Sequence, residues 1–150
     1  MDPITVLGIV GNILQFIDFG LKAVSKAREI HSSSTGDLLE NVELELLTKD
    51  ITIVTEKLST ANGAVTGNGS LDDICKRCIQ AANELMGALS GMRVHEKSKW
   101  KSVRQALKAT WGKTQVDELR RRLEGWKDEI QFHVLVDLKY AALVSHCKNV

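Results

Sequence analysis

Proline and aromatic residues are scarce in this chain. Pro3 is the one proline among 150 residues, so proline interrupts no helix beyond the first turn. Phe, Trp and Tyr together make up 5% of the chain, which disfavours an all-β domain because strands are enriched in aromatic side chains. Both shortages favour long, uninterrupted helices.

Cysteine is also sparse, and its number is odd. Cys75, Cys78 and Cys147 do not make the framework of a disulfide-stabilised secreted domain, so a reducing compartment fits better. A structural zinc site needs four ligands, and no second CxxC or HxxxH pattern accompanies Cys75 and Cys78. We therefore expect these two thiols in the core, and we expect neither a metal nor a cofactor.

Motifs for catalysis are missing as well. The four histidines are scattered, and none stands in a pattern that pairs a nucleophile with a base. The glycine-rich stretch 63–70 precedes a helix but lacks the lysine of a phosphate-binding P-loop. We expect no catalytic residue, since an enzyme would need a polar cleft that the sequence does not display.

Helical periodicity dominates what is present. A chain of this length suits one domain, and we treat residues 1–150 as a single unit. Apolar residues recur every three or four positions, and Asp2, Asp37, Ser70 and Thr114 stand where helix caps are expected. The sequence predicts an all-α fold, an antiparallel bundle of four to five helices, over residues 3–30, 37–60, 70–91, about 100–111 and 114–146.

Two segments have ambiguous patterns. The β-branched run "ITIVT" at 51–55 would suggest a strand by itself, but apolar stripes continue through it and predict a helix. The run "IQFHVLVDL" at 130–138 is apolar nearly all round, which predicts a central position in the bundle.

The N-terminal stretch carries no charge from Pro3 to Ile17. It lacks the basic start and the cleavage site of a signal peptide. It has the length of a membrane span, but Asn12, Gln15 and Asp18 offset most of the gain from its apolar residues. We expect a core helix, with membrane insertion restricted to an assembled state in which neighbouring copies shield the polar groups.

Charge is divided unevenly along the chain. Residues 1–90 hold seven Lys and Arg against twelve Asp and Glu, whereas residues 91–150 hold thirteen against seven. The basic surplus is densest in the segment 93–113, whose cations are either a solvated helix face or a site for anionic lipid. The lipid-facing candidates, inferred from charge, are Lys99, Lys101, Arg104 and Lys108; nucleic acid is not expected, because no reading motif accompanies them.

Three blocks carry a resemblance to a known family. They are "MDPITVLGIVGNILQFIDFGLKAVSKAREIHSSSTG", "ENVELELLTKDI" and "KWKSVRQALKATW…VDELRRRLEGWKDEIQFHVL". Over nearly the whole chain the sequence resembles the N-terminal domain of fungal NOD-like receptors, the STAND NTPases, in their HeLo-like group. In that family a nucleotide-binding module follows, so the resemblance implies an excised domain or a stand-alone relative.

The resemblance implies a non-catalytic role in fungal innate immunity, heterokaryon incompatibility and programmed cell death. It implies a cytoplasmic protein that oligomerises and moves to the plasma membrane on activation, with itself and anionic lipids as partners. The alternative is an interaction or oligomerisation adaptor without membrane activity. Carried onto this chain, the membrane-inserting candidates are Ile4, Leu7, Ile9, Val10, Ile13, Leu14, Phe16, Ile17, Phe19 and Leu21.

Overall fold

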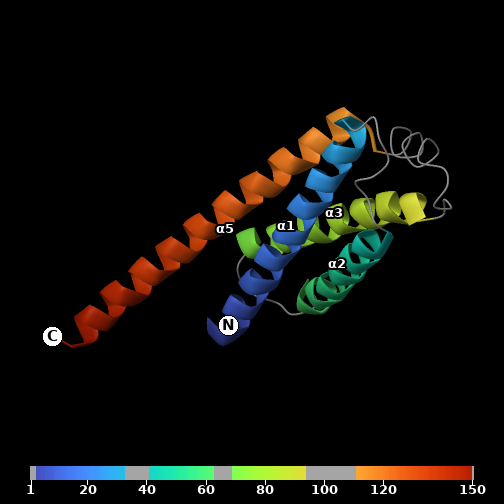
Figure 1. Ribbon diagram of the computed structural model, residues 1–150. Coiled ribbons are helices and arrows are strands. Elements are labelled where there is room, and N and C mark those ends of the chain that lie inside the picture. Colours follow the sequence, from blue (N-terminus) through green and yellow to red (C-terminus); the bar gives the residue numbers. More distant parts are fainter. Residues whose placement is uncertain (1–2, 33–40, 63–68, 94–110, 150) are drawn as a thin grey trace.

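The fold is all-α and consists of a helical bundle, as the periodicity predicted (Figure 1). The computed structural model describes residues 3–32, 41–62, 69–93 and 111–149. These residues form four helices, and no strand occurs among them. The helices are α1 (Pro3–Ser32), α2 (Asn41–Asn62), α3 (Gly69–Arg93) and α5 (Lys113–Lys148). The helix expected over 100–111 lies outside the described residues, apart from Trp111.

The helix bounds follow the prediction closely, with corrections at the caps. α3 begins at Gly69, so Ser70 lies in its first turn and is not its cap. Thr114 is not the cap of α5 either: the helix begins at Lys113 and Gly112 holds the cap position. The Gly112 N–H donates to Oε1 of Gln115 at 2.9 Å, and the Gly112 carbonyl accepts from the N–H of Val116 at 3.0 Å. Asp2 and Asp37 lie outside the described residues.

The β-branched run in α2 is helical, as expected. Thr52 and Thr55 donate their hydroxyl hydrogens to the carbonyls four residues earlier, at 2.7 and 2.6 Å. These bonds satisfy each hydroxyl within the helix itself. Thr55 can therefore be buried beside Ile51 and Val54 without an unpaired polar group.

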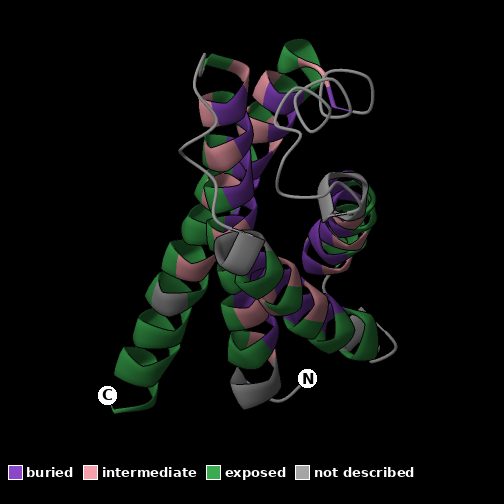
Figure 2. Ribbon diagram, turned by 45° about the vertical axis from the view of Figure 1, so that its right-hand side comes forward, coloured by how far each residue is buried: buried purple, intermediate pink, exposed green. Residues whose placement is uncertain are grey.

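The core is built around α1, which packs against α2, α3 and α5. Figure 2 shows the buried sides of the helices turned toward one another. α1 and α5 run antiparallel, so that the last turn of α1 lies beside the first turn of α5. The large side chains with less than 2% of their surface exposed come from all four helices: Ile13, Phe16, Ile17, Ile30, Ile51, Leu58, Ile74, Leu85, Leu89, Leu119 and Leu123.

One expectation about the core is wrong. The segment 130–138 was expected at the centre of the bundle, yet beyond the buried Ile130 it projects from the bundle into solvent. Phe132 is 66% exposed and Leu135 63% exposed. The cause is that α1 and α5 diverge. The end of α1 lies beside the start of α5, and the two helices separate toward the N-terminus of α1 and the C-terminus of α5 (Figure 1). Two straight helices that cross at an angle stay in contact over a limited length, and the N-terminal half of α1 packs on α2 instead.

Candidate interaction surface

The most distinctive surface of the molecule is the outer part of α5. We call residues 131–149 the α5 arm. His133 and Val134 are half-buried, and every other side chain described in the arm is exposed (Figure 2). At 1.5 Å per residue the arm is roughly 28 Å long. It is therefore a free helix of about five turns that extends from a packed bundle.

The arm exposes large apolar side chains to water. Phe132, at 66%, and Leu143, at 65%, are nearly as exposed as side chains on an isolated helix. The apolar side chains of the arm leave on the order of 600 Å² in water, the size of the largest apolar patch on a typical monomer. The largest apolar patch of a monomer is often functional, for example as a site of contact with another molecule. The contributing residues are Phe132, Leu135, Val136, Tyr140, Leu143 and Val144.

The exposed patch is not a simple continuation of the core face of α5. The core stripe of α5 consists of Val116, Leu119, Leu123, Trp126 and Ile130, with Val134 half-buried at its end, as the sequence predicted. A second stripe follows spacings of four, three and four residues, and we call it the arm stripe: Val136, Tyr140, Leu143 and Cys147. Because an α-helix turns about 100° per residue, the arm stripe points roughly 120° away from the core stripe. α5 thus has two apolar faces, and the bundle covers one of them.

Few charges interrupt this surface. Asp137, Lys139 and Lys148 are the only Asp, Glu, Lys or Arg residues between 131 and 149. The first half of α5, in contrast, carries a charge at nine of the thirteen positions from Asp117 to Glu129. A low charge density favours contact with another apolar surface, since no ion has to be desolvated when it forms.

α1 is a core helix, as expected, although it has the length of a membrane span. Over Val6–Ser32 it is the one described helix that is long and apolar enough to cross a membrane, a test that core helices also pass. Most of its membrane-inserting candidates face the core. Ile9, Val10, Ile13, Phe16 and Ile17 are buried, Leu14, Phe19 and Leu21 are half-buried, Leu7 is 62% exposed, and the side chain of Ile4 lies outside the described residues.

The polar residues of α1 form the solvent-facing side of the helix. Gln15 and Lys22 are exposed and Asn12 is half-exposed. Asp18 is exposed as well, and its Oδ1 lies 3.9 Å from Nζ of Lys127. The candidate lipid-facing cations Lys99, Lys101, Arg104 and Lys108 lie outside the described residues.

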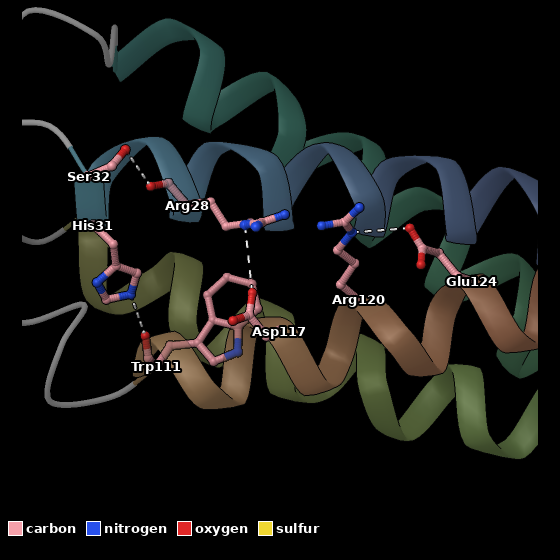
Figure 3. A network of polar contacts seen from close by, with 7 residues as sticks. All are labelled: Arg28, His31, Ser32, Trp111, Asp117, Arg120 and Glu124. Atoms are coloured by element: carbon pink, nitrogen blue, oxygen red, sulfur yellow. Dashed lines mark hydrogen bonds and ion pairs between the residues drawn. The ribbon is translucent and has the colours of Figure 1, made fainter.

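A polar cleft of about 640 Å³ lies between the end of α1 and the start of α5. Figure 3 shows the contacts along it. Nε2 of His31 donates to the carbonyl of Trp111 at 3.1 Å, and Nε of Arg28 lies 3.6 Å from Oδ1 of Asp117. Nε of Arg120 lies 3.1 Å from Oε1 of Glu124. The contacts of His31 and Arg28 join the end of α1 to the start of α5, whereas the pair of Arg120 and Glu124 lies within α5.

The cysteine pair is part of the core, as the sequence predicted. Cys75 and Cys78 are buried free thiols, and Sγ of Cys75 lies 3.6 Å from the carbonyl of Leu58. Burial raises the pKa of Cys78 to about 12, with a smaller contribution from Cys75, and burial followed by the charge of Asp72 raises the pKa of Cys75. Thiols of this kind are poor nucleophiles and metal ligands. Within the four described helices, no three His, Cys, Asp or Glu residues are grouped to hold a metal.

Comparison with protein-family models, with curated proteins and with solved structures gave no match. Any function therefore has to be inferred from the geometry of the surface.

The arm was not predicted from the sequence, although one signal was available. α5 is the longest described helix, and its apolar residues after Ile130 lie on all sides of the helix. A helix that packs on one side only would carry a single apolar stripe.

Proposed function

We propose that this chain is a non-catalytic interaction and oligomerisation domain of the kind found at the N-terminus of fungal NOD-like receptors. The observation that carries the proposal is the α5 arm, with its exposed apolar face and few charges. A monomer that kept about 600 Å² of apolar surface in water would gain free energy by covering it, at ~25 cal/mol per Å². The bundle supplies a rigid base, and the arm presents the contact surface.

The burial of α1 favours this role over direct membrane insertion. Five of its large side chains, Ile9, Val10, Ile13, Phe16 and Ile17, would leave the core if the helix entered lipid from the folded bundle. At roughly 1.5–3 kcal/mol for each buried side chain, the loss of packing is on the order of 10 kcal/mol. A domain has a total stability of about 5–15 kcal/mol. Insertion would therefore require the bundle to open, driven by assembly or by a partner.

A membrane effector is the second candidate function, supported by the length and apolar composition of α1. In this scheme oligomerisation releases α1, which then enters the plasma membrane together with neighbouring copies. The scheme also includes the basic segment before α5 as a contact for anionic lipid. It shares the first step, self-association, with the adaptor role, and it differs in the later step of membrane entry.

Sedimentation and liposome leakage distinguish the two candidates. We expect the purified chain to associate reversibly in the absence of lipid and to leave vesicles of phosphatidylcholine and phosphatidylserine intact. Tyr140→Asp should weaken association because it places a charge in the arm stripe, at a side chain that is 70% exposed. Gln131→Asp, on a polar position of the same helix, is the matched control and should associate like the wild type.

Two results would contradict the proposal. A chain that stays monomeric at every concentration without lipid does not act by self-association through the arm. Leakage of anionic vesicles by the wild type, retained in Tyr140→Asp, would support the membrane effector in place of the adaptor.

A further inference from the structure

We propose that the α5 arm pairs with the α5 arm of a second copy, antiparallel about a two-fold axis. This inference rests on the proposed function and specifies the partner. The pairing places Tyr140 against Leu143 of the second copy, and Val136 against Cys147 of the second copy.

The spacing of the arm stripe supports a paired helix. Val136, Tyr140, Leu143 and Cys147 alternate steps of four and three residues, which is the pattern of the contact seam between two helices that pack side by side. In the proposed register every residue of the stripe meets a stripe residue of the other copy. A shift by one heptad step would set Leu143 against His133 and Cys147 against Glu129, so the apolar contact would be partly lost.

The area of the surface fits a symmetric pair. The pair would cover most of the apolar surface of Val136, Tyr140, Leu143 and Val144, on the order of 400 Å² per copy, and the smaller protein interfaces take up to about 600 Å² from each partner. Flanking polar atoms of the arm can supply the remainder. A two-fold pair also covers both arms at once and closes, so that it does not extend into a filament.

The first half of α5 decides between the two orientations. On the side of the helix where the arm stripe lies, this half carries Glu118, Arg122, Gly125 and Glu129. In a parallel pair, Glu118 and Glu129 would each lie against the same glutamate of the second copy. It would also press on α3, which lies on this side because Nη2 of Arg122 is 3.1 Å from Oε2 of Glu84. An antiparallel pair overlaps only the arms and leaves the two bundles at opposite ends.

The first test compares two acidic substitutions on the same turn of the arm. Leu143→Asp lies in the arm stripe, and Ser145→Asp lies on the opposite side of the helix. Both positions are exposed, so neither change disturbs the core, and circular dichroism verifies the fold. We expect Leu143→Asp to weaken dimerisation by about 100-fold in sedimentation velocity, because two carboxylates would be buried at the seam, and Ser145→Asp to leave it within twofold.

Disulfide formation tests the orientation, since Cys147 is exposed whereas Cys75 and Cys78 are buried. In the antiparallel pair the two copies of Cys147 lie about 16 Å apart along the helix. Mild oxidation should therefore give no cross-linked dimer from the wild type, and a cross-linked dimer from Val136→Cys. Removing the native thiol, in Val136→Cys with Cys147→Ser, should abolish the cross-link.

The outcomes separate the inference from the proposed function. A wild-type dimer cross-linked through Cys147 would show parallel pairing and overturn the inference, while the oligomerisation role would stand. A dimer that is insensitive to Leu143→Asp would assign the interface to another surface and also overturn the inference. A chain that remains monomeric at all concentrations would overturn both.

Discussion

Gly20 provides a sharp test of how tightly α1 is held in the bundle. It lies in the middle of α1, where this helix contacts α5 and α3. A Cβ atom added at Gly20 would lie 2.9 Å from Cδ1 of Leu123 and 3.7 Å from Cδ1 of Leu85. Both leucines are fully buried. Leu85 is at ordinary contact distance, but the end of the Leu123 side chain has to shift within the core, so we expect Gly20→Ala to overpack this contact.

Gly11 is the matched control, because it occupies the interior of the same helix but faces solvent. A Cβ added there meets nothing within 4 Å. Glycine is about 0.8–1 kcal/mol less favourable than alanine inside a helix, so Gly11→Ala should raise the free energy of unfolding by roughly that amount. Gly20→Ala gains the same helix preference and loses about 1–3 kcal/mol to overpacking. Subtracting one variant from the other removes the propensity term and leaves the packing cost.

Urea denaturation followed by circular dichroism measures this difference, at protein concentrations low enough to avoid association. We expect Gly20→Ala to be less stable than Gly11→Ala by about 1–3 kcal/mol. Equal stabilisation of the two variants would refute the close approach of α1 to Leu123. It would also mean that α1 is packed loosely enough to leave the bundle at a lower cost than its burial indicates.

Three further predictions concern the core. Phe16→Ala should lower the free energy of unfolding by about 3–5 kcal/mol, because Phe16 has no exposed surface. The control Leu7→Ala should change it by no more than about 0.5 kcal/mol, because Leu7 is exposed. Equal effects of the two variants in urea denaturation would contradict the orientation of α1. Alkylation followed by intact mass should modify Cys147 in the native chain and reach Cys75 and Cys78 only after unfolding, because burial raises the pKa of both. Burial raises the pKa of Cys78 from 9.0 to about 12, so between these pH values the unfolded chain loses the thiol proton while the folded chain keeps it. The free energy of unfolding should be unaffected by this group below pH 9.0 and should fall as the pH rises from 9.0 toward about 12. Cys78→Ala should show a shallower alkaline loss of stability.

Most of the helices could be predicted from local patterns. The recurrence of apolar residues every three or four positions located the helices to within a few residues, including α2 despite its β-branched run. The core stripe from Val116 to Ile130 was also predicted correctly, because periodicity states which side of a helix is apolar. The caps of α3 and α5 were harder to predict, since a helix can begin at a glycine when another group satisfies its first N–H, as Gln115 does for Gly112.

Residue spacing within single helices was enough to establish that this protein is helical, that α1 is apolar along one broad face, and that the cysteine pair belongs to the core. What covers each of these faces was settled by tertiary packing. α1, which has the length of a membrane span, packs its apolar face against three helices, while the apolar side chains at the end of α5 are left in water. Both results depend on the angle at which α1 and α5 diverge, and that angle is set by side-chain packing between helices distant in sequence, as at Gly20 and Leu123.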